Sequence, residues 1–197
     1  LKAILFGYAC HSTVLSFMTF SGDYPGWAQQ YLEEAHPGAV AMFVAGCGGD
    51  QNPYPRRLAQ WAPRHGRSLA NAVEAGLIAN PKRLRGRLRT AYAIVDLDYA
   101  PPPTRKQLEE KAEAANRYDR RHAEFLLEYW DATGSLRKNY PYPVQVMRIG
   151  DGMTMVALGG EAVVDYSLRF KRELTKEHLW VAGYSNDVMG YIPSLRV

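Results

Sequence analysis

Two short, unbroken apolar runs with a helical stretch between them place the tightest constraint on how this chain can fold. Residues 3–9 and residues 39–46 are continuously apolar, and such runs suit strands buried inside a sheet. Residues 24–35 between them have the composition of a helix, with Asp23 as the expected N-cap and the sequence His36-Pro37-Gly38 as its stop. The first 46 residues therefore predict a strand, a helix and a second strand.

The rest of the chain continues this alternation. A helix is predicted over residues 56–78, broken by Pro63, and a strand over residues 87–98. The later predictions are a long helix over 104–132, a hairpin of 143–149 and 153–159, a helix from 161 to 174 and a strand over 179–184. Strands alternating with helices predict an α/β fold, with a mixed or mostly parallel sheet flanked by helices and a helical insertion around residues 100–140.

Composition places the chain among ordinary globular proteins. Of its 197 residues, 47% are apolar and 22% charged, and no apolar run reaches the roughly 20 residues needed to span a bilayer. The net charge is +4, and the densest basic run lies between Lys82 and Arg89. A solvated face is the ordinary interpretation of this run, and contact with anionic lipid headgroups is the functional one. No aromatic residue is interleaved with the basic ones, so we predict no nucleic-acid partner.

The chain has two cysteines, too few for a disulfide framework. Cys10 and Cys47 each end a predicted strand. If those strands are neighbours, the two side chains could form a bridge, whereas two buried free thiols are the commoner outcome.

Polar loops follow the predicted strands, where the sites of open α/β sheets gather. They are residues 10–13, 46–53 and 183–187, together with the Gly-Gly-Glu segment that ends at Glu161. Each has an ordinary explanation by itself, because His11 could be a structural histidine and Glu161 could favour a helix N-terminus. The glycine-rich loop lacks the Lys-Ser/Thr of a P-loop, and the chain has no HExxH motif, no CxxC pair and no GxSxG elbow. A serine hydrolase is therefore excluded.

Taken together, these segments are more specific. The sequences GYACHST, SGDYPGWA, FVAGCGGDQNP, LGGE and VAGYSNDVMGYIPS resemble the neutral/alkaline (non-lysosomal) ceramidase family in order and approximate spacing. The resemblance covers most of the chain, more weakly between residues 80 and 145. It implies that residues 1–197 are part of a single neutral-ceramidase-like catalytic domain whose N-terminal portion and C-terminal remainder are missing. It also favours a secreted or periplasmic protein.

The resemblance implies a zinc site. Its ligands here would be His11, Glu161 and Tyr191, with Tyr191 preferred over Tyr184, and the family's remaining histidine ligand would lie before residue 1. Zinc accepts histidine nitrogen and carboxylate oxygen, polarises a carbonyl and lowers the pKa of bound water toward about 7. These 197 residues alone are expected to bind zinc weakly and to show little activity. Were the whole site inside the chain, the missing ligand would come from His36, His65, His122 or His178.

One position departs from the family pattern. The family has a Gly-Asp-x-Ser-Pro-Asn loop with its serine beside the zinc, whereas this chain has Asn52 at the place of that serine. Asn52 can still donate a hydrogen bond to an oxyanion, so Asn52 and Asp50 are the candidate catalytic residues. The change is compatible with metal-activated water and incompatible with a serine-centred reaction.

The expected function is a zinc-dependent amidase that cleaves an N-acyl sphingoid, ceramide-like lipid. The alternative is a non-catalytic relative that keeps the fold and binds a lipid or a glycan. The expected partners are a small-molecule or lipid substrate and a membrane surface contacted peripherally. The sequence leaves the oligomeric state and the acyl chain open.

Overall fold

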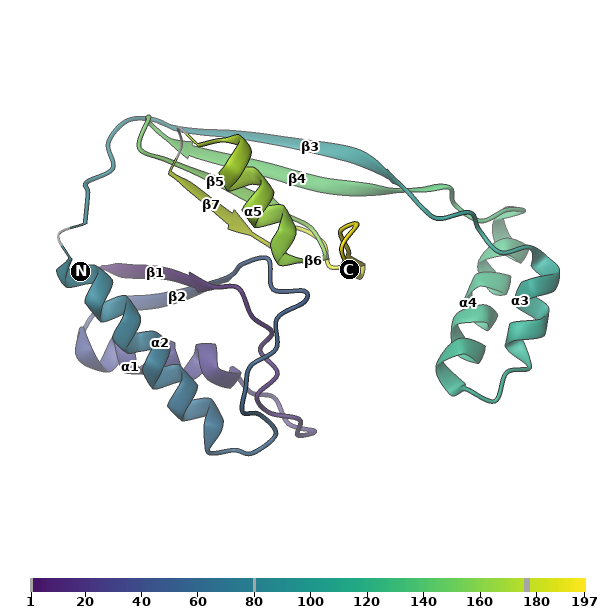
Figure 1. The fold of residues 1–197 in the computed structure, drawn as a ribbon, viewed down its shortest axis with the longest axis horizontal. Helices are drawn as coiled ribbons and strands as arrows, with labels where there is room; N and C mark the ends of the chain where they lie inside the picture. Colours follow the sequence, from purple (N-terminus) through teal and green to yellow (C-terminus); the bar gives the residue numbers. More distant parts are fainter. Residues whose placement is uncertain (1, 80, 176–177) are drawn as a thin grey trace. The chain divides into compact units, whose positions relative to one another are not determined.

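A computed structural model describes residues 2–79, 81–175 and 178–197 and confirms the predicted α/β class (Figure 1). The elements in chain order are β1 (Ala3–Tyr8), α1 (Asp23–Ala35), β2 (Val40–Ala45), α2 (Trp61–Ile78), β3 (Leu88–Asp98), α3 (Arg105–Ala112), α4 (Arg117–Thr133), β4 (Asn139–Ile149), β5 (Met153–Leu158), β6 (Glu161–Ala162), α5 (Val164–Glu173), β7 (Leu179–Ala182) and β8 (Tyr191–Ile192). The chain forms two compact units, one of Leu1–Ala93 with Pro143–Val197 and one of Ile94–Tyr142. Within the described ranges, no helix combines the length and apolar character needed to cross a membrane.

The predicted strand–helix–strand unit is present at the start of the chain. β1 and β2 pair in parallel, with Ala3 opposite Val40 and Tyr8 opposite Ala45. One face of this pair packs against α1 and α2 through a core of small and large apolar side chains. This core contains Ile4, Phe6, Ala28, Leu32, Ala39, Ala41 and Ala70.

The opposite face of the same strand pair is partly exposed, so the prediction of two fully buried strands is wrong for this face. Leu5 is 48% exposed and Met42 is 43% exposed. Gly7 lies on this face, and a Cβ atom added there would stand 2.7 Å from the indole ring of Trp180 in β7. A pair of strands has only two faces to cover, and here the helices cover one of them while Trp180 approaches the other.

A second sheet has the strand order β3-β4-β5-β7 and is mixed. β4 and β5 form the predicted antiparallel hairpin, with Ile149 opposite Met153, whereas β5 and β7 run parallel. Every residue of β3 except Leu97 is exposed, as suits a strand at the sheet edge. The last predicted strand is shorter than expected, because β7 ends at Ala182.

The predicted long helix over residues 104–132 is two antiparallel helices, α3 and α4 (Figure 1). Thr104 and Gln107 form a capping box at the start of α3. Asn116 stops a continuous helix because its side chain accepts a hydrogen bond from the Tyr118 amide and caps α4. Gly134 ends α4 in the left-handed conformation that glycine adopts without strain.

Two details of the first helices differ from the predictions. Pro63 does not break α2, because the helix starts at Trp61 and a proline in the first turn loses no helical hydrogen bond. Asp23 is not the cap of α1, whose N-cap is Gly22. The Asp23 carboxylate instead accepts a hydrogen bond from the Leu15 amide at 2.8 Å, so it fixes the loop after β1.

The carboxyl ends of β1, β2 and β7 meet. Gly46 donates its amide to the Tyr8 carbonyl and forms an isolated bridge with Ala182. The Gly183 amide donates to the Ala45 carbonyl at 3.0 Å. The three polar loops that follow these strands are therefore brought to one place.

Candidate functional site

His11 is held by the loop that follows β2. Its backbone amide donates to the Gln51 carbonyl at 2.9 Å, and its ring Nε2 lies 3.1 Å from the Gly49 carbonyl oxygen. Gly49 in turn donates its amide to the Ala162 carbonyl, and a Cβ atom there would stand 2.3 Å from the carbonyl oxygen of Glu161. Only glycine allows this approach, which brings the His11 loop against the segment that carries Glu161.

Glu161 lies on a short strand and not at a helix start, which corrects the prediction of a helix from residue 161. It belongs to β6, which pairs in parallel with β8 so that Glu161 and Tyr191 are opposite each other. Helix α5 begins three residues later, at Val164, with Val163 as its N-cap. The helix dipole therefore does not account for this carboxylate by itself.

The side chains of His11, Glu161, Tyr184 and Tyr191 meet in what we call the His–Glu–Tyr cluster. His11 Nδ1 lies 3.6 Å from Glu161 Oε2. The Tyr184 hydroxyl lies 3.2 Å from His11 Nδ1 and 3.5 Å from Glu161 Oε2, and the Tyr191 hydroxyl lies 3.5 Å from His11 Nε2. The side chains of His11 and Glu161 are only 12% and 22% exposed. The structure thus brings together the three residues expected from the sequence and adds Tyr184.

Tyr184 is not among the ligands that the family resemblance implies, because Tyr191 matches the family's tyrosine position and Tyr184 follows directly on the end of a strand. Its φ of 53° turns the chain sharply after Gly183, and its amide donates to the Gly160 carbonyl. This turn directs the phenol toward His11. The sequence signal that could have indicated this role is the position of Tyr184, directly after Gly183 in one of the polar loops that follow strands.

The two phenols share an environment that disfavours their ionised forms. Partial loss of solvation, followed by the charge of Glu161, raises the pKa of both Tyr184 and Tyr191. In the protein alone, both hydroxyls are therefore protonated at neutral pH and can donate hydrogen bonds.

Ligands at 2.0–2.1 Å around a tetrahedral zinc stand roughly 3.3 Å apart. His11 Nδ1, Glu161 Oε2 and the Tyr184 hydroxyl lie 3.2–3.6 Å from one another, whereas the Tyr191 hydroxyl lies nearest the other ring nitrogen, Nε2. In the described part of the chain, no three His, Cys, Asp or Glu side chains form a metal-binding group. The phenols would therefore have to supply ligands beside His11 and Glu161.

His36 and His65 have polar partners outside the cluster. His36 Nε2 lies 2.8 Å from Glu74 and His65 Nε2 lies 2.8 Å from the Pro55 carbonyl. His122 belongs to the unit Ile94–Tyr142. The described hydrogen bonds of these three histidines include none to the His–Glu–Tyr cluster.

Asp50 and Asn52 border the cluster without bonding to it. Asp50 Oδ1 accepts from the Val164 amide at 2.9 Å, and Oδ2 lies 2.7 Å from Arg196. Desolvation alone would raise the pKa of the Asp50 carboxyl, but these hydrogen bonds outweigh it and hold that pKa below its ordinary value. Asn52 Oδ1 accepts from Arg56 at 2.8 Å and from Thr13 at 3.3 Å.

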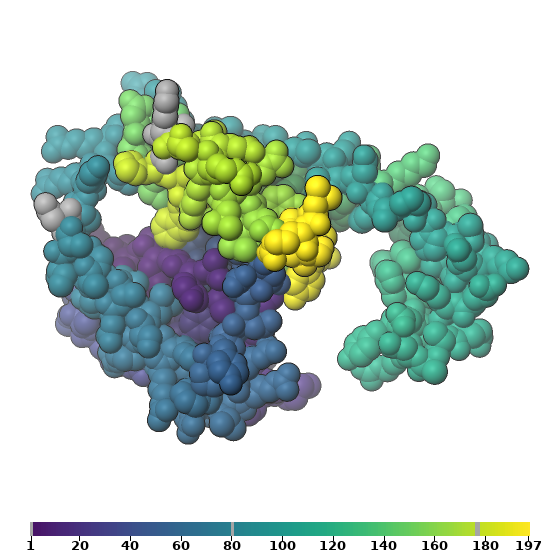
Figure 2. All heavy atoms as spheres, viewed as in Figure 1, coloured from purple at the N-terminus to yellow at the C-terminus, as the bar shows by residue number. Residues whose placement is uncertain are grey.

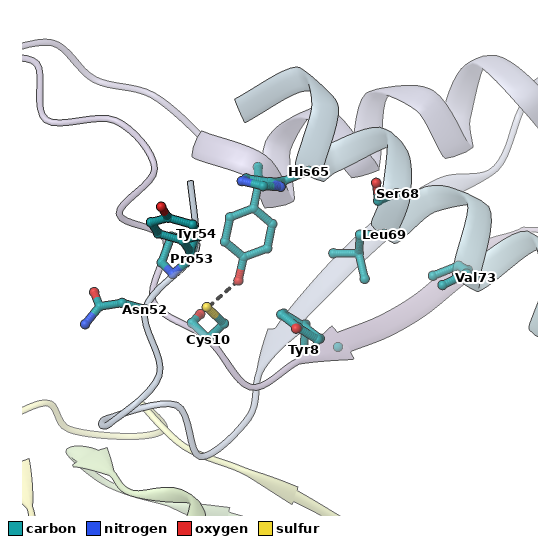
Figure 3. A pocket seen from close by; sticks show the side chains of 12 residues that line it. Tyr8, Cys10, Asn52, Pro53, Tyr54, His65, Ser68, Leu69 and Val73 are labelled. Atoms are coloured by element: carbon teal, nitrogen blue, oxygen red, sulfur yellow. Dashed lines mark hydrogen bonds between the residues drawn. The ribbon is translucent and has the colours of Figure 1, made fainter. Parts of the chain in front are cut away.

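A cavity of about 540 Å³ lies on the α2 side of these loops (Figure 3). Tyr8, Cys10 and the loop residues Asn52–Tyr54 line one side of it, and α2 residues including Leu69 and Val73 line the other. His11 and Glu161 are not among its lining residues. The cavity shares with the cluster only the loop after β1, in which the lining residue Cys10 directly precedes His11.

Both cysteines are free thiols, so the structure favours the unbridged alternative. Cys47 is fully buried, and this burial raises its pKa to about 11. Cys10 is partly exposed, with a pKa raised by burial and then by the charge of Asp23.

Comparison with known proteins relates this geometry to one fold. No protein-family model matches the chain, and no curated protein is detectably similar in sequence. A solved structure of neutral ceramidase from Pseudomonas aeruginosa is 18% identical with a TM-score of 0.64, and the match covers 98% of this chain and 38% of that one. A structure of ceramidase complexed with C2 is 17% identical with a TM-score of 0.66, over 97% of this chain and 40% of that one. The chain thus shares the fold of about two fifths of these proteins.

Proposed function

We propose that this chain belongs with the neutral ceramidases and forms the metal centre of a zinc-dependent amidase. The observation that carries the proposal is the convergence of His11, Glu161, Tyr184 and Tyr191, with contacts of 3.2–3.6 Å, on a fold shared with two ceramidase structures. The proposed substrate is an N-acyl sphingoid lipid, the class to which the neighbours' names refer.

In this proposal His11, Glu161 and Tyr191 hold the zinc, together with a histidine from outside these residues. A zinc ion bound there would supply Lewis acidity and a hydroxide at neutral pH. The Gly49 carbonyl would accept a hydrogen bond from the Nε2–H group of His11, which orients the imidazole as partners of metal-binding histidines do. This leaves Nδ1, the ring nitrogen nearest Glu161 Oε2, to bind the metal, and Tyr184 would donate to Glu161.

Asn52 is the residue proposed to bind the substrate carbonyl. Its side-chain oxygen is engaged by Arg56 and Thr13, which leaves the amide nitrogen to donate. A donor aimed at a developing oxyanion typically contributes about 10²–10³ in kcat. Asn52 cannot replace a serine as a nucleophile, so the reaction proposed here uses water.

A second candidate function is lipid or glycan binding without catalysis. The observation in its favour is Asn52 itself, because an amide stands where the resembling family has a hydroxyl. In this case the His–Glu–Tyr cluster would be retained as structure. Zinc content together with turnover separates the two functions.

A peripheral membrane contact accompanies the proposed lipid substrate. The basic residues between Lys82 and Arg89 are all exposed, and none forms an ion pair within the described residues. Each such residue near an anionic surface contributes roughly 1 kcal/mol of attraction. Binding to anionic but not to neutral vesicles would test this contact.

The decisive experiment measures zinc content and hydrolysis of an N-acyl sphingosine in the longest natural form of the protein. We expect about one zinc per chain and turnover that is lost on chelation and restored by zinc. His11→Gln should lose both, whereas His36→Gln, which removes a histidine paired with Glu74, should keep both. Turnover without zinc would overturn the metal centre, and stoichiometric zinc without turnover on any N-acyl lipid would favour the binding protein.

A further inference from the structure

The last residues of the chain are tied to two separate parts of the fold by one guanidinium group. Arg196 Nη2 lies 2.7 Å from Asp50 Oδ2 in the loop after β2. Arg196 Nε lies 2.9 and 3.1 Å from the two carboxylate oxygens of Asp165 in the first turn of α5. The Ser194 hydroxyl also hydrogen-bonds to Asp165. Figure 2 shows the C-terminal segment in yellow against the yellow-green atoms around α5 and the blue atoms of the earlier loop.

This segment carries Tyr191, whose other anchors are its contacts with His11 and the hydrogen bond from the Tyr166 hydroxyl to the Pro193 carbonyl. Tyr191 is 59% exposed, so core packing does not determine its position. Its strand has two residues and pairs with an equally short one, through the bonds from the Glu161 amide to the Gly190 carbonyl and from the Val163 amide to the Ile192 carbonyl. So short a strand pair is not stable by itself, and its geometry depends on what anchors its ends.

The partners of Arg196 are connected to the rest of the cluster. Asp50 follows Gly49, whose carbonyl contacts His11, and Asp50 also caps α5 through the Val164 amide. Asp165 is in the helix that follows Glu161. A single arginine therefore joins the segments that hold His11, Glu161 and Tyr191.

We propose that Arg196 is a positioning residue that locks β8 against β6 and so sets Tyr191 in the His–Glu–Tyr cluster. The consequence for catalysis rests on the proposed function, whereas the mechanical role does not. The planar guanidinium suits the task because it donates in two directions at fixed angles, which a lysine ammonium does not reproduce. Asp50 is, in this proposal, the bridge between Arg196 and the His11 loop.

The pKa values of the two acidic partners agree with this geometry. Hydrogen bonds from Ser194 and then from Arg196 hold the pKa of Asp165 below its ordinary value, and the pKa of Asp50 is lowered as well. Both carboxylates are thus ionised at neutral pH, as the two-sided bridge requires.

Amide hydrogen exchange tests the mechanical role. In Arg196→Gln, the amides of Glu161 and Val163 should exchange about tenfold faster. The reason is that the free energy needed to open the β6–β8 pair falls by roughly the contribution of one charge-assisted hydrogen bond. In Arg196→Lys, the exchange rates of these amides should lie between those of Arg196→Gln and those of the wild type. The matched control is Arg169→Gln, which removes an exposed arginine of α5 paired with Glu173. Unchanged exchange in Arg196→Gln, or equal acceleration in the control, would overturn the proposal.

Turnover then tests the catalytic consequence. With an N-acyl lipid as substrate, Arg196→Gln should lower kcat about 10–100-fold while KM changes by less than about threefold, because misplacement of a site group slows chemistry more than binding. Faster exchange with a wild-type kcat would refute the link to catalysis. Absence of turnover in the wild type would count against the proposed function, and the exchange result would still decide the role of Arg196.

Discussion

The hydroxyl of Tyr184 lies 3.2 Å from Nδ1 of His11, a residue 173 positions earlier in the chain. The contact exists because Gly46, which directly follows β2, donates its amide to Tyr8 at the end of β1 and forms a bridge with Ala182 at the end of β7. Two elements that the sequence separates thus share one site.

Glu161→Gln should weaken zinc binding by at least about 100-fold and abolish turnover, because a neutral amide replaces a charged ligand. Zinc titration with a competing chelator and an amidase assay measure the two effects. Glu173→Gln, at the exposed end of α5, is the control. Full zinc content with a wild-type rate in Glu161→Gln would show that the carboxylate is not a ligand.

Tyr191→Phe should lower activity more than Tyr184→Phe. Loss of the Tyr184 hydroxyl removes a hydrogen bond to a zinc ligand, which typically lowers metal affinity or activity about 10–100-fold. Loss of a zinc ligand itself should lower activity by a larger factor. The structure gives both phenols a contact with His11, so both variants should differ from the wild type. An equal loss, or a larger one at Tyr184, would transfer the ligand role to Tyr184.

The thiols should differ in reactivity in the folded protein. Cys47 has a pKa of about 11 and is fully buried, so almost none of it is thiolate or accessible at pH 8. Cys10 is partly exposed and should react slowly, and two thiols per chain should react after unfolding without reductant. Fewer than two thiols in the unfolded, unreduced protein would contradict the free cysteines.

Stability should fall in acid in part through Asp50 and Asp165. Their folded-state pKa values are below the ordinary value of about 3.9, so near and below that pH the unfolded chain binds more protons than the folded one. Their contribution is therefore present above about pH 4 and is lost as the pH falls through the folded-state pKa values. Urea unfolding between pH 6 and pH 3 should show a smaller decrease for Asp50→Asn than for the wild type. An identical pH dependence would exclude Asp50 from this effect.

Gly7→Ala should destabilise the fold by about 1–3 kcal/mol, as overpacking does. The added Cβ would stand 2.6 Å from the Val44 carbonyl oxygen and 2.7 Å from the Trp180 ring. Gly76→Ala in α2 meets nothing within 4 Å and should instead stabilise by about 0.5–1 kcal/mol, because alanine is the better helix residue. Denaturant midpoints of the two variants should move in opposite directions.

Local patterns in the sequence predicted most elements, and the resemblance to the ceramidase family supplied the zinc-ligand candidates. The apolar runs at residues 3–9 and 39–46 predicted β1 and β2, and Gly150-Asp151-Gly152 predicted the β4–β5 hairpin. The division of residues 104–132 was missed because its signal, the cap at Asn116, is a single side chain inside a helical pattern. The helical spacing of apolar residues extends over many positions, so a single capping residue does not disturb it. The backbone helix, in contrast, ends where that side chain hydrogen-bonds to a backbone amide.

Proximity was decided by the tertiary structure alone. The sequence placed His11, Glu161 and Tyr191 at the ends of predicted elements, but which ends meet depends on the strand order and on the pairing of Glu161 with Tyr191. The contact of Tyr184 with His11 and the bridge from Arg196 to Asp50 and Asp165 span 31 to 173 positions, and no local pattern encodes them. Local propensities act over a turn or a strand, while the pairing of distant segments is set by the packing of the whole sheet.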